Sequence, residues 1–500
     1  MQQNISRWLS QPVSIAPLVT LRVVIGAMLV FSTARFWALG WVDDHYIHPQ
    51  FHFKYFGFEW VEPLSAIGMY TVHALLIVSS LCVLLGLFYR VAAVAQFLLF
   101  TYTELIDLTY YLNHYYFVSI VCGLLIFVPA NRAYSLDTLR RPAIFQKKIP
   151  RWTIFIFQLQ LGIVYFYAGL WKINYDWLVN ALPLKIWIPA NDQLPLVGWL
   201  FQQKITPWLF SWAGMLYDVT IVFWLSWWRS RPWAYLTVVV FHTLTGQMFQ
   251  IGVFPLVMMG ATLVFFSEKW HERLWNWASA TFTKPSRFRK RVSNQTFASL
   301  GVFTKRSLTL GDGLLGKNTK QGEESRRKAR VERTDSVRMT NVAYTKSSER
   351  RRQFIIHNSS FLILFFAFQI LFPWRYLLYP GSVFWTEEGY RFSWRVMLME
   401  KAGTATFFVK DSKTGREGEV VNSEFLNPHQ EKQMAMQPDM ILQFAHFLKK
   451  HYAAQGMSEP LVRVEAYVTL NARPSKLLID PNIDLTKLRD GWSHKTWITN

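Results

Sequence analysis

The chain has 500 residues, of which 51% are hydrophobic and 17% aromatic, and its formal net charge at pH 7 is +21. This much apolar sequence, gathered in long blocks, excludes an ordinary string of soluble domains. The charge does not indicate a nucleic-acid-binding protein, because much of it lies in residues 284–352. There 19 Lys or Arg stand against 6 Asp or Glu, without the interleaved aromatic residues that would stack on bases.

Long apolar stretches predict eight or nine membrane-spanning helices. The candidates are residues 15–38, 64–88, 91–108, 114–130, 153–171, 206–226, 233–250, 251–267 and 359–378. Several are near the lower limit of about 17 residues for a span. The stretch 233–267 is therefore either a tight hairpin of two helices or one span followed by a re-entrant segment. The two cysteines, Cys82 and Cys122, both lie in apolar spans and offer neither a disulfide framework nor a metal cluster. The sequence therefore predicts no metal site.

The distribution of charge predicts an orientation. Residues 284–352 are rich in Ser, Thr, Asn and Gly and lack apolar periodicity, which indicates a flexible loop on the cytoplasmic side. With nine spans and this loop inside, the basic residues of the 132–151 loop also lie inside, and the acidic loop 39–63 lies outside. The last span, within residues 353–378, then carries residues 379–500 to the non-cytoplasmic side.

The C-terminal segment has a different character. Residues Ala405–Lys410 and Val462–Leu470 alternate as strands do, and Asp411–Gly415 has the composition of a turn. Asp439–Tyr452 has helical spacing of its apolar residues. The sequence thus predicts a multi-pass α-helical membrane protein with a C-terminal, mostly β, extracytoplasmic domain. The predicted parts are a helical domain, a basic loop, a last transmembrane helix and an outer domain, at residues 1–283, 284–352, 353–378 and 379–500.

Lys172 stands at the end of a long apolar run that begins near Phe155, between Trp171 and Trp177. An ammonium at the edge of hydrocarbon is costly, and a lysine relieves the cost by snorkelling or by losing its proton. Snorkelling would make it an interfacial anchor, whereas a buried, uncharged amine in an apolar niche would be a base. Asp176 would oppose the second role if it paired with Lys172, and we expect Asp176 to point elsewhere.

Two histidines lie in or beside the predicted spans. His114 follows Asn113 at the outer end of the fourth span, where a lone histidine usually forms hydrogen bonds at the membrane surface. His242 lies within the seventh span, where a polar ring needs a partner. If it only packs, Thr245 and Gln247 are the expected partners.

Several segments, in order along the chain, resemble the vitamin K-dependent gamma-glutamyl carboxylase family and its bacterial relatives, the horizontally transferred transmembrane domain (HTTM) proteins. The similar segments are LNHYY at 112–116, NRAYSLD at 131–137, residues 165–177 and 241–254, GYRFSW at 389–394 and DPNID at 480–484. Motifs that recur in this order across both predicted domains are far more specific than any one of them.

The resemblance implies one enzyme, similar to peptidyl-glutamate 4-carboxylase. Such an enzyme is both a carbon–carbon lyase and a vitamin K hydroquinone epoxidase. It would couple oxygenation of reduced vitamin K, phylloquinol or menaquinol, to CO2 addition at the γ carbon of glutamate in a protein. The co-substrates would be O2 and CO2, without a metal. The expected setting is a bacterial inner membrane, with the lipid bilayer as partner and the active site toward the non-cytoplasmic face.

The same resemblance assigns roles to individual residues. The expected catalytic residues are Lys172, as the base that starts the reaction, His114 and Tyr390; the cofactor-binding residues are Asn113, His242 and Trp171; the substrate-binding residues are Arg391 and Arg395. A guanidinium group clamps a carboxylate through two hydrogen bonds, which suits arginine to the last role. Tyr390 could instead be an aromatic anchor where the outer domain meets the helices.

Two other functions stay open. Animal members of the family carry a histidine where this chain has Leu398–Glu400, which leaves room for a quinol epoxidase or oxidase without carboxylation. The third possibility is a non-catalytic membrane protein that binds lipid or quinone. A transporter would instead place polar residues near the bilayer midplane, in broken and repeated helices.

Overall fold

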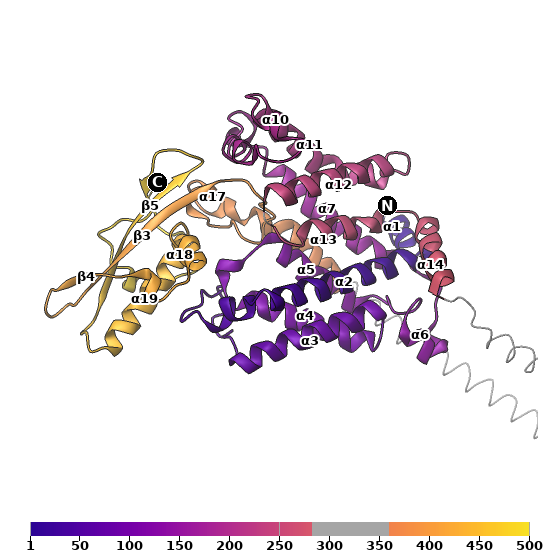
Figure 1. The fold of residues 1–500 in the computed structure, drawn as a ribbon, viewed down its shortest axis with the longest axis horizontal. Coiled ribbons are helices and arrows are strands. Elements are labelled where there is room, and N and C mark those ends of the chain that lie inside the picture. Colours follow the sequence, from indigo (N-terminus) through magenta and orange to yellow (C-terminus); the bar gives the residue numbers. More distant parts are fainter. Residues whose placement is uncertain (1, 250, 283–359, 500) are drawn as a thin grey trace, which may run out of the picture. The chain divides into compact units, whose positions relative to one another are not determined.

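The computed structural model describes residues 2–249, 251–282 and 360–499, so the predicted basic loop lies outside the described part of the chain (Figure 1). The described chain is mostly helical, with a small sheet near its C-terminal end. Five helices are long and apolar enough to cross a membrane. They are α2 (Ala16–Ala38), α3 (Ala66–Leu85), α7 (Trp152–Leu170), α11 (Thr206–Ser226) and the helix at Ser360–Leu378.

Shorter or less apolar helices occupy the remaining predicted spans: α4 (Tyr89–Leu105), α5 (Asn113–Phe127), α12 (Arg231–Met248) and α13 (Phe254–Thr262). The apolar helix that begins with α13 ends at Phe265, which gives it a length of about 18 Å at 1.5 Å per residue. A hydrocarbon core is about 30 Å thick. The length favours the re-entrant alternative for the stretch 233–267, and the total of eight or nine spans stays a prediction.

The chain divides into two compact units, residues 1–272 with 369–500, and residues 273–368; the contacts below belong to the first. In this unit α2 packs on α3, α3 on α4 and α4 on α5, while α7 packs on α11 and α11 on α12. α13 touches both α2 and α12, and α5 touches α7, so the two series are joined. The start of α5 and the end of α7, which carry predicted site residues, therefore belong to one bundle.

The NRAYSLD segment is tied to the start of α4 by hydrogen bonds to its last residue, Asp137. The Asp137 carboxylate accepts hydrogen bonds from the backbone N–H groups of Phe88 and Tyr89, at 2.9 and 3.0 Å, and from the Asn131 amide at 2.8 Å. It thereby caps the first turn of α4, whose N–H groups have no partner within the helix. The Arg22 guanidinium bonds the carbonyl of Ala130 at 2.8 Å. This motif therefore has a structural role.

Replacing Asp137 with alanine should lower the free energy of unfolding by about 2 kcal/mol, because backbone donors lose a charged acceptor. Thermal unfolding of the purified protein in detergent measures the change. Asp137→Asn keeps one carbonyl oxygen as acceptor and should lose less. A variant as stable as the wild type would contradict the capping role.

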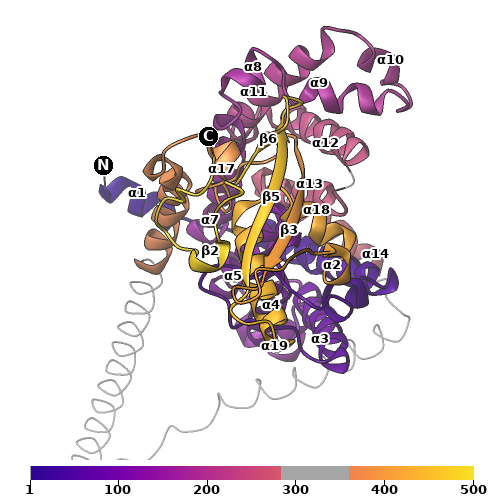
Figure 2. The same cartoon turned by 90° about the vertical axis from the view of Figure 1, so that its left-hand side faces the viewer.

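The C-terminal sheet follows the predicted strands. β3 (Lys401–Lys410) and β5 (Leu461–Leu470) run antiparallel along their whole length, and Figure 2 shows them side by side. The short strands β4 (Glu417–Glu419) and β6 (Lys476–Leu477) extend the sheet in the order β4-β3-β5-β6. The predicted turn at Asp411–Gly415 is also confirmed, since the Gly415 N–H donates to the Asp411 carbonyl at 2.9 Å.

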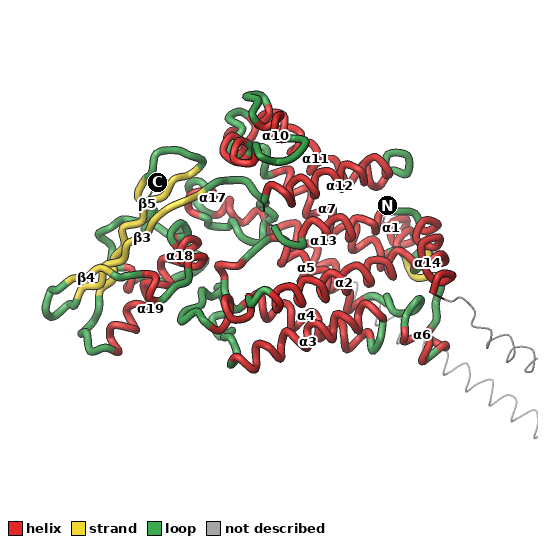
Figure 3. The backbone as a smooth tube through the Cα atoms, viewed as in Figure 1, coloured by secondary structure: helices red, strands yellow, loops and turns green. Residues whose placement is uncertain are grey.

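One helix covers this sheet, as the sequence predicted. α19 (Pro438–Ala454) contains the predicted helix Asp439–Tyr452 and packs on both long strands (Figure 3). Inward residues of β5, such as Val462 and Val464, are fully buried. The rings of Phe407 on β3 and Phe444 on α19 meet edge to face, with centroids 5.0 Å apart.

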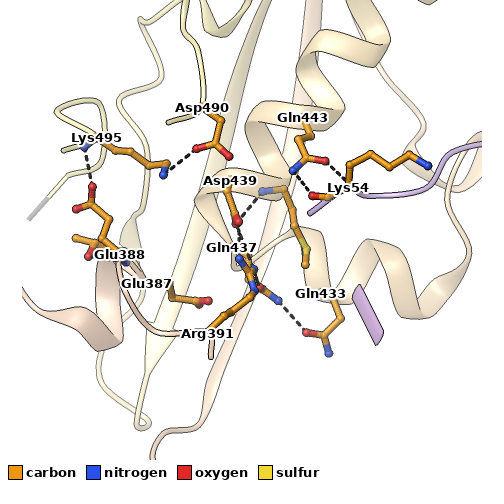
Figure 4. A network of polar contacts seen from close by, with 12 residues as sticks. Lys54, Glu387, Glu388, Arg391, Gln433, Gln437, Asp439, Gln443, Asp490 and Lys495 are labelled. Carbon is orange, nitrogen blue, oxygen red and sulfur yellow. Dashed lines mark hydrogen bonds and ion pairs between the residues drawn. The ribbon is translucent and has the colours of Figure 1, made fainter. Parts of the chain in front are cut away.

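The loop between α2 and α3 is part of the same core. Phe53 is fully buried in the cluster that holds Phe407 and Phe444. Next to it, the Lys54 N–H donates to the Gln443 side chain at 2.8 Å, and the Gln443 amide donates back to the Lys54 carbonyl at 3.0 Å (Figure 4). These contacts attach the C-terminal domain to the loop between α2 and α3.

Candidate functional site

Lys172 lies two residues beyond the end of α7 and is 5% exposed. Its ammonium donates hydrogen bonds to the Ala168 carbonyl at 3.1 Å and to the Asp218 carboxylate at 2.8 Å. The Trp177 ring centroid is 5.3 Å from the same nitrogen. The side chain is therefore turned into the protein, whereas a snorkelling anchor would reach the membrane surface.

Asp218 is the residue that sequence reasoning missed. It lies within α11 and is 4% exposed. The expectation of an amine in a purely apolar niche was wrong, because this carboxylate faces it. The expectation for Asp176 was right, since its carboxylate pairs with Arg473 at 2.5 Å instead. A lone carboxylate in an otherwise apolar span is a functional signal by itself, and it could have identified Asp218.

A glycine allows the lysine and the aspartate to meet. A Cβ atom at Gly169 would lie 2.6 Å from the backbone nitrogen of Val219 and 2.9 Å from the Cβ of Asp218. Only glycine therefore permits this close approach of α7 and α11. A buried lysine and carboxylate can exist as an ion pair or, after one proton shift, as an amine and a carboxylic acid. One proton can thus pass between Lys172 and Asp218 inside the protein.

A second group of predicted residues gathers next to Trp171. The Arg395 guanidinium lies 4.0 Å over the Trp171 ring and 4.4 Å over the Tyr376 ring. The Trp171 indole donates to the Ser393 carbonyl at 2.6 Å, and the Asn113 amide donates to the Arg395 carbonyl at 2.9 Å. The structure thus brings together Asn113 of α5, Trp171 at the C-terminal end of α7 and Arg395, which directly follows the GYRFSW segment.

Arg395 has spare hydrogen-bonding capacity. It is 2% exposed, and its Nε has no hydrogen-bond partner, nor has the indole nitrogen of the neighbouring Trp394. Burial lowers the pKa of Arg395 to about 10, so it stays charged at pH 7. Among the described residues no carboxylate pairs with it. A buried, unpaired guanidinium suits a carboxylate brought by a ligand.

Arg391 is placed differently, because it already has partners. Its guanidinium pairs with Asp439 at 2.5 Å and also bonds the Gln437 side chain (Figure 4). Burial alone would raise the pKa of Asp439, but Arg391 outweighs it and the pKa is lowered. This pair holds the GYRFSW segment to the first turn of α19.

The Arg391–Asp439 pair predicts a pH dependence. Because the pKa of Asp439 is lowered in the folded protein, its contribution to stability is complete above the unfolded value of about 3.9. The contribution is lost as pH falls through the lower, folded value. Asp439→Asn should therefore make thermal stability fall less steeply between about pH 5 and pH 3. Parallel pH profiles of the two proteins would contradict this.

The backbone around Tyr390 has an unusual conformation. Gly389, Phe392, Trp394 and Met397 all have positive φ, at 82°, 57°, 58° and 51°. Bulky residues rarely adopt this region, and such strain gathers at functional sites. Burial raises the pKa of the Tyr390 phenol, whereas the nearby charge of Arg395 acts in the opposite direction.

His114 and His242 both contact one ring, that of Phe254. His114 stacks on it with centroids 4.7 Å apart, and His242 meets its edge at 5.8 Å. His242 Nε2 is 3.0 Å from the Tyr165 hydroxyl, and its Nδ1 has no partner. The partner is thus Tyr165 rather than Thr245 or Gln247. His114 makes no hydrogen bond to any residue that the structure describes.

The surroundings of His114 suit a hydroxylated aromatic ring chemically. Phe254, Tyr115 and aliphatic side chains line a cavity beside it, and both histidines have nitrogen atoms without partners. The cavity volume is about 20 Å³, enough for about one water. A quinol-sized ring therefore enters only when the lining side chains move. No contact between described residues joins Lys172, His114 and Tyr390, so the three predicted catalytic residues lie in neighbouring places rather than one.

Within the described part of the chain, no group of His, Cys, Asp and Glu side chains could hold a metal ion. Residues 10–270 match the family model of the HTTM domain. Residues 356–500 match the family model of the vitamin K-dependent gamma-carboxylase lumenal domain. No solved structure matches the chain. The matches cover both the helical bundle and the C-terminal domain, including every residue assigned a role from the sequence.

Proposed function

Because the chain belongs to the vitamin K-dependent gamma-carboxylase family, we propose that it is an enzyme that couples oxygenation of reduced vitamin K to carboxylation of protein glutamate. The family acts on glutamate-containing proteins and implies a vitamin K cofactor. Its HTTM domain and apolar helices make this an integral membrane protein. Epoxide formation, CO2 addition at the γ carbon and the use of phylloquinol or menaquinol are parts of the proposal.

A carboxylate that only stabilised the ammonium would oppose the role of a base, as stated above for Asp176. The buried pair of Lys172 and Asp218 supports the role because one proton can pass between the two groups, and it is the observation that carries the proposal. Reduced vitamin K, when bound, supplies the electrons that activate O2. The chain must supply a base, and Lys172 becomes one when its proton sits on the Asp218 carboxylate, 2.8 Å away. Lys172 and Asp218 are 5% and 4% exposed, and two charges in so buried a site carry a desolvation cost that transfer of the proton from one group to the other removes. The Lys172 Nζ then accepts a proton from a hydroxyl held beside it.

The remaining residues bind and orient. Arg395 would hold the glutamate carboxylate, with Trp171 and Asn113 fixing its position. Tyr390 lies close enough to Arg395 for the guanidinium charge to act on its phenol. Tyr390 would shield the reacting carbon. His114 would hold the quinol oxygen, because a neutral imidazole can donate one hydrogen bond and accept another. The expected substrate role of Arg391 is less favoured, since its guanidinium is engaged.

The proposed organisation follows the charge pattern of the loops. Residues 1–283 form the helical domain, with eight or nine spans in the chain as a whole. The basic loop 284–352 faces the cytoplasm, residues 353–378 form the last span, and residues 379–500 face the opposite side of a bacterial inner membrane. Lys172 and Arg395 would then act at the non-cytoplasmic face.

One assay separates the proposed function from its alternatives. The purified protein is given phylloquinol or menaquinol, O2, labelled CO2 and a glutamate peptide, and the epoxide and fixed label are measured in the same tube. Both products are expected. Epoxide without fixed label would favour the quinol epoxidase, and quinol binding without either product would favour the non-catalytic binding protein.

A further inference from the structure

A separate cavity of about 210 Å³ lies between the last turns of α2 and α4 and the first half of α3. One side is closed by η1 (Asp43–Ile47) and by α18 (Pro428–Met434) of the C-terminal domain. It shares the side chains of Ser32, Phe100 and Tyr115 with the small cavity beside His114, but none of the residues assigned a role above lines it. Its volume is far larger than the ~10–15 Å³ that one water needs.

The cavity contains a carboxylate without a partner. Glu104 lines it from the last turn of α4, and no residue in the described ranges forms a hydrogen bond or an ion pair with it. The other acidic residue, Asp107, is fully engaged. It accepts from the backbone and hydroxyl of Thr109, at 2.9 and 2.7 Å, and from the Gln430 amide at 2.7 Å. Of the two acidic side chains that line the cavity, Glu104 therefore leaves its carboxylate oxygens free for a ligand.

Aromatic rings form the walls around this carboxylate. Phe36, Tyr46, Phe100, Tyr110, Tyr111 and Tyr115 line the cavity. The His45 ring stacks on Tyr110 with centroids 3.9 Å apart, and Tyr110 stacks on His429 at 4.6 Å. The faces of such rings attract cations electrostatically.

The described side chains that line this cavity include no permanent cation. No lysine or arginine is among the lining residues. Burial, reinforced by the neighbouring His429, lowers the pKa of His45 to about 4, so His45 is neutral at pH 7. Burial also lowers the pKa of His429, whose Nε2 already donates to the Thr109 carbonyl at 3.1 Å. An isolated carboxylate in a confined site is costly, and a cationic ligand would relieve that cost.

We propose that this cavity binds an organic ammonium group, paired with the Glu104 carboxylate and enclosed by the surrounding aromatic rings. A metal ion is a poorer occupant, because the described side chains form no set of three that could ligate one. The ammonium group is either free or carried by a lipid headgroup, since α2 and α3, which line the cavity, are long and apolar enough to cross a membrane. The proposal does not depend on the carboxylase function, because it uses none of the residues proposed for that reaction.

Calorimetric titration of the purified full-length protein with choline tests the free ligand. The control is 3,3-dimethylbutan-1-ol, which has the same shape without the charge, and sodium chloride matches the ionic strength. We expect saturable binding of choline but not of the alcohol. Glu104→Gln should weaken it at least about tenfold, since a charged hydrogen bond contributes about 1.5–3 kcal/mol. Glu59 is an exposed carboxylate outside this cavity, so the Glu59→Gln variant serves as the control and should bind choline as the wild type does.

The lipid source is tested in nanodiscs of phosphatidylethanolamine or phosphatidylglycerol. Higher thermal stability in phosphatidylethanolamine that disappears in Glu104→Gln supports a headgroup as the ligand, even where choline does not bind. Phe36→Leu removes one aromatic wall without removing a hydrogen bond, and it should weaken binding several-fold; it serves as the test where Glu104→Gln does not fold. Equal binding of choline and its uncharged analogue, or no Glu104-dependent effect in either experiment, overturns the proposal.

Discussion

Replacing Lys172 with methionine should reduce CO2 incorporation into a glutamate peptide by about 10²- to 10⁴-fold, the usual contribution of a positioned acid or base. Methionine fills a similar volume but cannot accept a proton. Epoxide formation should fall in parallel, because the lysine acts before the two products diverge. Label fixation by the variant at the wild-type rate would remove Lys172 from the proposed mechanism.

Asp218 gives a second test of the same step. Asp218→Asn can still accept a hydrogen bond from Lys172 but cannot take its proton, so we expect a loss of activity comparable to that of Lys172→Met. If the carboxylate merely stabilised the ammonium, removing it would favour the neutral amine by desolvation and activity would persist or rise. The activity of Asp218→Asn, measured across pH, therefore shows whether Asp218 accepts the proton of Lys172 or only stabilises its charge.

Stability measurements separate this chemistry from folding. Removing one partner of a buried ion pair costs about 3–5 kcal/mol, whereas apolar replacement of both is often neutral. The double variant Lys172→Met/Asp218→Leu should therefore unfold near the wild-type temperature and remain inactive. An inactive but stable double variant excludes misfolding as the reason for lost activity.

The local parts of the fold were predictable from the sequence, because their signals are local. Alternation along Val462–Leu470 reflects one buried face of β5, and helical spacing in Asp439–Tyr452 reflects the face of α19 that packs on it. Such patterns need no knowledge of the partner element. The span count was harder, since a helix as short as α13 can be apolar without crossing a bilayer.

The partners of the candidate site residues were not predictable in the same way. Asp218 meets Lys172 because Gly169 allows α7 and α11 to approach closely, and no spacing along the sequence encodes that contact. From the sequence, Arg391 in the GYRFSW segment and Arg395 directly after it looked equivalent. They differ because Asp439 reaches only the first of them.

This difference between the arginines leads to the second large effect. Arg395→Met should raise the KM for a glutamate peptide by roughly 10- to 100-fold, because a charged hydrogen bond contributes about 1.5–3 kcal/mol. Arg395→Lys keeps the charge but loses the two-pronged geometry, so its KM should lie between those of the wild type and the methionine variant. Epoxide formed without peptide should fall less than label fixation, since no glutamate carboxylate is bound in that reaction.

Arg391→Met is the matched control, because the same substitution removes a guanidinium that is already paired. It should lower thermal stability, by leaving Asp439 buried without its partner, while the peptide KM of the folded protein changes little. The reverse pattern, with KM raised by Arg391→Met and untouched by Arg395→Met, would contradict the assignment. An unpaired buried cation is costly to keep unless a ligand uses it, and that cost is why Arg395 is expected to be the arginine that meets the substrate.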